Sequence, residues 1–104
     1  MKRRIHLEWD ERKDRENQKR HGISFLEASA VFDDPNSWMF PNYRHGEERW
    51  CTIGLIGTRF YSVFHLYDQA NDEEYFRLIS ARESEPPEIR RYNFRNNPEP
   101  ESHS

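Results

Sequence analysis

His65, Arg77 and Trp50 are the side chains whose types and spacing point most directly to chemistry. Arginine presents a planar fork of N–H donors that suits a phosphate group, and histidine titrates near neutral pH. An aromatic ring such as that of Trp50 can stack on a base. Metal-free RNA cleavage needs a base for the 2′-hydroxyl proton, an acid for the leaving 5′-oxygen and cations for the phosphate. The trio therefore suits recognition and scission of single-stranded RNA, with His65 as base or acid and Arg77 as charge stabiliser.

A predicted hairpin would bring these side chains together. Residues 49–56 and 59–67 flank Gly57-Thr58, a dipeptide typical of a two-residue type II′ turn. That turn pairs position 56 with 59, 53 with 62 and 50 with 65, and residues 75–82 return as the next strand. One face then carries Trp50, Thr52, Gly54, Tyr61, Val63 and His65, and we expect it to be open and to include Arg77 near His65. The other face is expected to pack under the helices, with Cys51, Ile53, Leu55, Phe60, Phe64, Leu66, Phe76 and Leu78.

The remaining elements follow from capping and periodicity. Residues 4–9 alternate as a half-buried strand, and 10–22 form a polar helix between an aspartate N-cap and a glycine. Residues 24–27 form a capping box for a second helix, residues 38–40 an edge strand, and Pro86-Pro87 begins a last helix. The predicted fold class is α+β, an antiparallel sheet with helices packed on one face.

Composition favours one small domain. The chain has 104 residues, of which 34% are hydrophobic and 14% aromatic, and its net charge is −3. We expect a single domain over 1–95 and a frayed polar tail over 96–104. Cys51 is the lone cysteine, and Asp33-Asp34 lacks a third ligand, so no metal or cofactor is expected. No membrane segment or signal peptide is predicted, which favours the cytoplasm.

Each candidate residue also has a structural explanation. A lone histidine or arginine on a polar sheet face is more often solvated or paired with a carboxylate. Arg82 could cap the sheet by pairing with Asp10 or Glu11, and Arg49 could pair with a neighbouring glutamate. Trp50 could be packed under a loop. One side of the first helix, which could be no more than a solvated surface, carries Lys13, Asn17 and His21 at i, i+4 and i+8.

Four motifs, in order along the chain, resemble those of the BrnT toxin family. They are Trp9-Asp10-Glu11 with Lys13, Asn17 and His21-Gly22; Val31-Phe32-Asp33-Asp34-Pro35; Glu47-Glu48-Arg49-Trp50 with Thr52 and Gly54; and Arg77-Leu78-Ile79-Ser80-Ala81-Arg82 with Glu88 and Tyr92. Each piece is weak alone, but four collinear pieces from about residue 7 to residue 92 are specific.

The resemblance implies a RelE-like fold and a type II toxin, a metal-independent ribonuclease that arrests translation. It also implies a hetero-oligomer with a BrnA-type ribbon-helix-helix antitoxin, through which alone the toxin would meet operator DNA. By position, the catalytic residues would be His65, Arg77, Arg49 and Arg82. The RNA-binding residues would be Lys13, His21, Trp50 and Tyr92, with Trp50 added for its stacking ring.

Two other interpretations stay open. The same scaffold could be a non-catalytic binding module whose arginines hold antitoxin carboxylates and which acts in operon repression. Composition alone supports no more than a solvated α+β domain.

Overall fold

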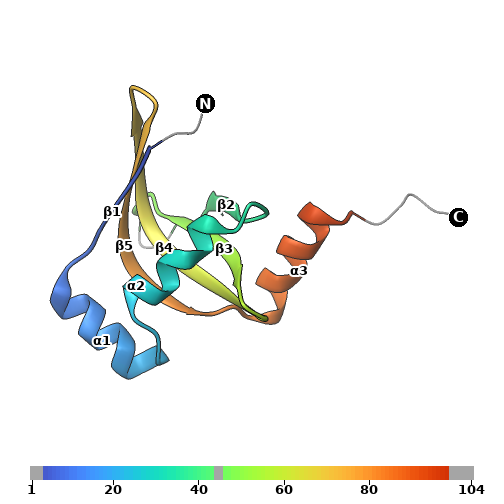
Figure 1. Ribbon diagram of the computed structural model, residues 1–104, viewed down its shortest axis with the longest axis horizontal. Helices are drawn as coiled ribbons and strands as arrows, with labels where there is room; N and C mark the ends of the chain where they lie inside the picture. Colours follow the sequence, from blue (N-terminus) through green and yellow to red (C-terminus); the bar gives the residue numbers. More distant parts are fainter. Residues whose placement is uncertain (1–3, 44–45, 99–104) are drawn as a thin grey trace, which may run out of the picture.

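The computed structural model describes residues 4–43 and 46–98, with a five-stranded mixed sheet in the order β1-β5-β4-β3-β2 (Figure 1). The strands are β1 (Arg4–Glu8), β2 (Trp38–Pro41), β3 (Trp50–Ile56), β4 (Arg59–Ala70) and β5 (Glu73–Glu83). The helices are α1 (Glu11–His21), α2 (Phe25–Ala28), the 3-10 helix η1 (Ser29–Asp33) and α3 (Pro86–Asn96). The α+β class is confirmed, and the arrangement is compatible with a RelE-like toxin. Most of the predicted tail lies outside the described residues.

The β3–β4 hairpin forms in the predicted register. Gly57 has a φ of 64°, whereas Thr58 has no positive φ, which is the pattern of a type II′ turn. The predicted pairs are present: Trp50 with His65, Ile53 with Ser62, and Ile56 with Arg59. The short turn thus fixes which side chains of β3 and β4 share a face.

The predicted helix ends are also confirmed. The Asp10 carboxylate accepts from the first backbone N–H groups of α1, and Gly22 ends that helix with a φ of 74°. Ser24 and Glu27 form the capping box that begins α2. These caps satisfy backbone groups that a helix end leaves without partners, so they place the helix boundaries.

The side of the sheet that α2 and η1 cover is called the α2 face. Its core joins the two helices to the central strands through Phe25, Ala28, Val31, Val63, Phe76, Leu78 and Ala81. A Cβ at Gly54 would lie 2.7 Å from the Cβ of Val31, so η1 can rest directly on β3 because that residue is a glycine. This is the face that we expected to be open, and that prediction is wrong.

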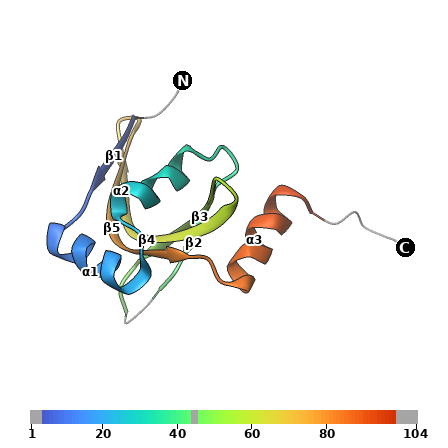
Figure 2. The same cartoon turned by 60° about the horizontal axis from the view of Figure 1, so that its bottom comes forward.

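The opposite side, against which α3 packs, is called the α3 face (Figure 2). Cys51, Ile53 and Tyr92 form a second core there, with Phe40, Phe60 and Phe64 at its margin. The fold therefore differs from the expectation in two details. Helices lie on both faces instead of one, and β1 runs parallel to β5, so the sheet is mixed and not purely antiparallel.

One buried asparagine fixes α1 beside β5. The pairing of β1 with β5 ends at Glu8 and Arg77, and Asn17 takes over the strand edge beyond them. Its Nδ2 donates to the carbonyls of Ala81 at 2.9 Å and Ile23 at 3.0 Å, and its Oδ1 accepts from the Ala81 N–H at 3.0 Å. Asn17 is 5% exposed. An amide that satisfies both polar groups of one strand residue holds α1 in a fixed position against the end of β5.

An irregularity between β4 and β5 decides which arginines share a face. Phe64 pairs with Ser80 and His65 with Leu78, so Ile79 is an extra residue on β5. His65 therefore faces α2 with Leu78, while Arg77 points to the α3 face. The predicted juxtaposition of His65 and Arg77 is wrong. Because of this extra residue, Arg82 lies on the α3 face together with Arg77. Simple alternation along β5 would have placed the two arginines on different faces.

Candidate active site

His65 is sealed under η1. Its exposed fraction is 0%, and its ring meets the edges of Phe32 and Phe76. Nδ1 donates to the Leu66 carbonyl at 2.9 Å, so Nε2 is the nitrogen that accepts from the Thr52 hydroxyl at 2.8 Å. Burial lowers the pKa of His65 to about 4, although the bond to the Leu66 carbonyl acts in the opposite direction. In this geometry the imidazole is a neutral core residue that a bound RNA does not reach.

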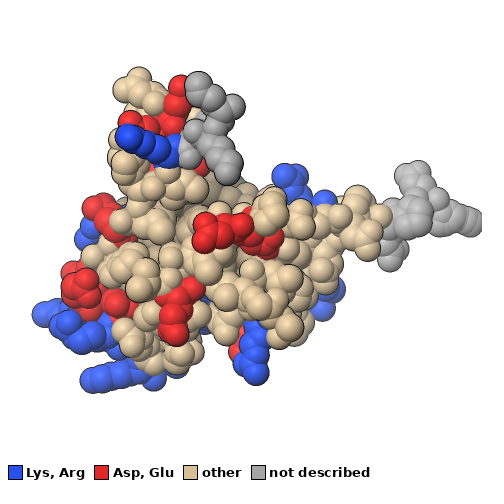
Figure 3. Space-filling view, in the orientation of Figure 1, with Lys and Arg blue, Asp and Glu red and all other residues tan. Residues whose placement is uncertain are grey.

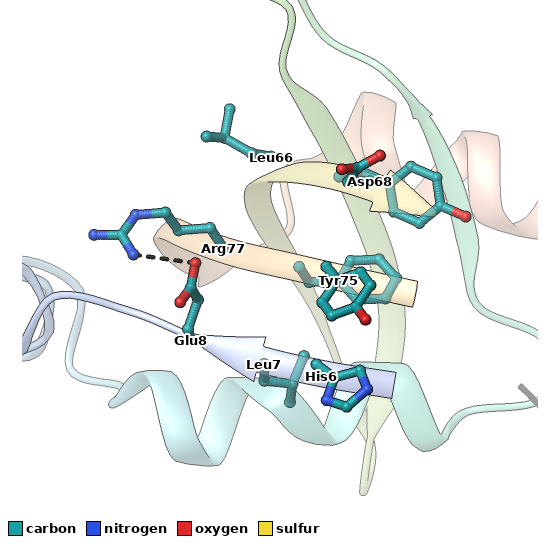
Figure 4. Close-up of a pocket in the computed structure, with 9 residues that line it drawn as sticks. His6, Leu7, Glu8, Leu66, Asp68, Tyr75 and Arg77 are labelled. Carbon is teal, nitrogen blue, oxygen red and sulfur yellow. Dashed lines mark ion pairs between the residues drawn. The ribbon is translucent and has the colours of Figure 1, made fainter. Parts of the chain in front are cut away.

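Arg77 lines a hollow of about 630 Å³ that is bordered by residues of β1, β4 and β5 (Figure 4). Its Nη1 lies 3.2 Å from Oε2 of Glu8, and both side chains are largely exposed. Leu66, Tyr75 and Asp68 project on the same side of the strands. Arg77 is the only Lys or Arg among the described residues that line this hollow, and it lies about 16 Å along β5 from Arg82.

Four predicted site residues meet at a different place, where α1, the start of β3 and the end of β5 converge. Two adjoining hollows of about 270 and 140 Å³ share Arg49 and Ser80. We call the two together the basic groove. Its basic lining consists of Lys13, Arg20, His21, Arg49 and Arg82. Figure 3 shows Lys and Arg side chains gathered at the α1 end of the molecule.

His21 supplies the groove with an accessible imidazole. It is the exposed last residue of α1. Partial burial and then the positive charges of Arg20 and Arg82 lower the pKa of His21 below its ordinary value of 6.5. A histidine with a lowered pKa is mostly neutral at pH 7, and a neutral imidazole can accept a proton. The influence of Arg82 on His21 also shows that the end of α1 and the end of β5 lie close together.

Arg82 is anchored by α3. Its two terminal nitrogens donate to the two oxygens of Glu88 at 2.8 and 2.7 Å, and its guanidinium lies 5.0 Å from the centre of the Phe64 ring. Glu88 also accepts from the Ser62 hydroxyl and the Glu85 N–H. Burial is the largest single influence on Glu88 and opposes its ionisation, but the bonds from Arg82, the Glu85 N–H and Ser62 together lower the pKa of the carboxyl. The partner of Arg82 is thus Glu88, and the predicted pairing with Asp10 or Glu11 is wrong.

Arg49 is held more loosely than Arg82. Its Nε and Nη2 donate to one oxygen of Glu47 at 3.0 and 2.9 Å, which confirms the predicted pairing with a neighbouring glutamate. The Glu47 side chain is 59% exposed, whereas that of Arg49 is 27% exposed. Because an exposed ion pair contributes little stability, a phosphate in the groove can replace Glu47 at small cost.

Two other predicted RNA-binding residues lie away from the groove. Trp50 shares the α2 face with His65, and its ring meets the edge of Tyr67. Tyr92 is buried in the α3-face core, where its hydroxyl donates to Asp34 at 2.7 Å. Burial and the bond to Asp34 raise the pKa of Tyr92 to about 12. In this geometry both rings have structural contacts and neither lines the basic groove.

Several residues that line the groove, among them the carboxylate of Glu16, were missing from the sequence prediction. Arg20, Ser80 and Asn42 line the two hollows, but none of them was proposed as a site residue. Arg20 directly precedes His21 at the end of a polar helix, so its position was a usable signal. Ser80 lies within the motif of residues 77–82 that carries the family resemblance, so it also had a signal. Asn42 had none, because it belongs to no motif and only the folded chain brings it beside Arg49.

Some motif residues thus line the basic groove, and others pack in the elements around it. The chain was then compared with known protein families. The model of the ribonuclease toxin BrnT, of type II toxin-antitoxin systems, matches residues 9–88. The chain belongs to the BrnT family. It is therefore a member of a family of ribonuclease toxins, and its type II class implies an antitoxin partner. A search of curated proteins gave no match.

The BrnT match includes both the groove and the residues that hold it. It spans Lys13, His21, Arg49 and Arg82, and it stops before Tyr92. No helix in the described part of this BrnT chain is long and apolar enough to cross a membrane. Within residues 4–43 and 46–98, no group of three or more His, Cys, Asp or Glu side chains could hold a metal ion.

Proposed function

We propose that this BrnT chain is an endoribonuclease that cleaves RNA in the basic groove without a metal ion and so inhibits translation in the cytoplasm. Its activity is neutralised by a BrnA-type ribbon-helix-helix antitoxin in a hetero-oligomer, and that antitoxin carries the contacts to operator DNA. The observation that carries the proposal is the convergence of four cationic side chains around one neutral, accessible imidazole. The cationic side chains are those of Lys13, Arg20, Arg49 and Arg82.

The groove residues have distinct roles in the proposed reaction. His21 takes the proton of the 2′-hydroxyl, and the 2′-oxygen attacks the phosphorus. The bond from phosphorus to the 5′-oxygen breaks, and that oxygen takes a proton from Lys13 or from solvent. Arg49 and Arg82 hold the phosphate and stabilise the charge that develops on it. The products are a 2′,3′-cyclic phosphate and a free 5′-hydroxyl.

This assignment revises the residues proposed from sequence. His65 and Arg77 leave the reaction, because one is sealed in the core and the other lies in a separate hollow. Lys13, Arg49 and Arg82 remain among the proposed site residues. His21 changes from an RNA contact to the proton acceptor, and Arg20 joins as the charge that helps to keep it neutral.

The test is cleavage of a mixed-sequence RNA by the purified chain in the presence of a chelator, followed by analysis of the product ends. A Lys13→Gln/Arg49→Gln variant should cleave at least about a hundredfold more slowly, because it removes two charges from the reacting phosphate. The matched control is Arg59→Gln, since Arg59 is an exposed arginine at the β3–β4 turn that pairs with Glu83 and lines neither hollow of the groove. This control should cleave like wild type.

Three results would contradict the proposal. Equal cleavage by the groove variant and wild type would exclude the basic groove as the cleavage site. Loss of cleavage when the chelator is added would exclude a metal-free reaction. A wild-type chain that binds its antitoxin but neither cleaves RNA nor slows growth would favour the non-catalytic binding module. Growth arrest on expression, reversed by co-expression of the adjacent antitoxin gene, would support the toxin role.

A further inference from the structure

Three arginines of the α3 face lie over aromatic rings, and only one of them belongs to the groove. Arg82 lies 5.0 Å from the centre of the Phe64 ring. Arg91 and Arg95 of α3 lie 4.7 and 5.9 Å from the rings of Phe40 and Trp38, both on β2. We call Arg82, Arg91 and Arg95 the arginine row. A guanidinium held over a ring has a more fixed position than that of a free side chain. The terminal nitrogens of Arg82 already donate to Glu88, whereas Arg91 and Arg95 make no ion pair with a carboxylate of the described residues.

The row is continuous with the basic groove. Phe64, Cys51 and Phe40 are direct neighbours across β4, β3 and β2, so the first two arginines of the row lie over rings about 10 Å apart. The electrostatic influence of both Arg82 and Arg91 on Cys51 agrees with this placement. Arg95 follows one helical turn after Arg91, about 6 Å along α3. The second spacing is close to one phosphate step of an extended RNA strand, and the first is longer than one step.

The charge of α3 also indicates an anionic ligand. Residues 86–98 have a net charge of +2 in a chain whose net charge is −3. In contrast to Arg82, neither Arg91 nor Arg95 has a carboxylate partner among the described residues. An acidic chain with two ring-held cations next to its groove, neither paired with a carboxylate in residues 4–43 or 46–98, has a local positive field there.

We propose that the arginine row is a track for single-stranded RNA, in which Arg91 and Arg95 bind the phosphates that follow the scissile one held at Arg82. This inference rests on the proposed function and adds a binding site to it. The chemistry is backbone recognition: the guanidinium edges contact phosphates, and bases can stack on the outer planes of the guanidinium groups. Arg91 and Arg95 give affinity for RNA length and take no part in bond cleavage, in contrast to Arg82.

The first test measures RNA binding with a probe that cannot be cleaved. A fluorescent RNA of about 20 nucleotides, 2′-O-methylated throughout, is titrated between about 0.05 and 0.2 M salt. Arg91→Gln/Arg95→Gln should bind about tenfold more weakly at low salt. The plot of log association constant against log salt concentration should become less steep by about 1.4, because two phosphate contacts are lost at about 0.7 each. Arg91→Lys/Arg95→Lys keeps the charges and should retain most of the slope.

The matched control lies on the same helix. Arg90 directly precedes Arg91 but lines a separate hollow with Asn93, Phe94 and Asn97. Arg90→Gln removes the same charge one position away, so it should leave the slope within the error of wild type. Thermal melts of all variants check that α3 remains folded. Equal slopes for the row variant and the Arg90 variant would overturn the track.

The second test separates the track from the reaction. Wild type should cleave a long RNA with a higher kcat/KM than a trinucleotide, and the row variant should lose that advantage while it cleaves the trinucleotide normally. If wild type cleaves RNA and the Arg91→Gln/Arg95→Gln variant shows the same dependence on RNA length, the track is overturned but the proposed function stands. Absence of cleavage by wild type would contradict the proposed function itself. Normal RNA binding with lost antitoxin binding would assign the row to a protein interface and overturn the RNA track.

Discussion

The α2 face and the basic groove each hold one histidine, and the two rings have opposite environments. His65 is fully buried, with both ring nitrogens bonded to neighbours in the sheet. His21 is exposed at the end of α1, among cationic side chains, and its ring makes no hydrogen bond to another described residue. The pKa of both is lowered, in each case mainly by burial. Access and neighbours, and not the residue type, separate the core histidine from the candidate base.

The two arginines of β5, Arg77 and Arg82, show the same contrast. Arg77 makes a single exposed contact with Glu8, whereas Arg82 makes two contacts with the half-buried Glu88 and also borders the groove. A bidentate pair holds its guanidinium in one orientation, which a single exposed contact does not. Arg82 is thus both a link between β5 and α3 and a positioned charge, while Arg77 is free to move.

The largest expected effect separates the two histidines. His21→Gln should lower the rate of RNA cleavage by about a hundredfold to a thousandfold, because it removes the proposed general base. His65→Gln should lower stability but leave the rate for each folded molecule within about twofold. Rates are measured at a temperature where denaturant melts show both variants to be folded. The exposed His6→Gln variant serves as the control for His21. A folded but inactive His65 variant would reverse the assignment.

The next effect concerns stability in mild acid. The pKa of His65 is about 4 in the folded chain, against an ordinary value of 6.5. Between these values the unfolded chain binds more protons, so the free energy of unfolding falls as the pH falls from about 6.5 to about 4. The loss should be about 3 kcal/mol for this one group.

Urea unfolding at a series of pH values measures that loss. His65→Gln should flatten the dependence above about pH 4.5, where the carboxyls of Asp34 and Glu88 remain ionised because their pKa values are lowered. His21→Gln should change it less, because His21 is exposed and its imidazole is less desolvated. An unchanged pH dependence in the His65 variant would show that the ring is not desolvated as the structure places it.

Local signals predicted most of the fold. Gly57-Thr58 determined the β3–β4 register, and Asp10, Gly22 and the capping box at Ser24 marked the helix ends. Each of these signals acts within a few residues, where turn geometry or an unpaired backbone group leaves few choices. This is why the element order was predicted correctly.

The assignment of faces failed because it depends on contacts that are distant in sequence. Both faces of β3 and β4 carry apolar side chains, and both are covered, one by η1 and the other by α3. The extra residue at Ile79 has no glycine or proline to announce it, yet it puts Phe76, Arg77 and Leu78 on the opposite face from the one predicted, while Arg82 shares the face of Phe64 as predicted. Lys13, His21, Arg49 and Arg82 were nevertheless identified, because the family resemblance includes residues that meet only in the folded chain.

The smallest expected effect compares the two arginine–carboxylate pairs. Glu88→Gln should lower the free energy of unfolding by about 2 kcal/mol, because it leaves the half-buried Arg82 without its bidentate partner. Glu8→Gln should change it by about 0.5 kcal/mol or less, since the Glu8 side chain is 67% exposed and its pairing with Arg77 is screened by water. Urea unfolding at pH 7 measures both. Equal losses of stability would mean that Arg77 is held as firmly as Arg82. The difference between the two arginines would then come from the charges around them and not from how each is anchored.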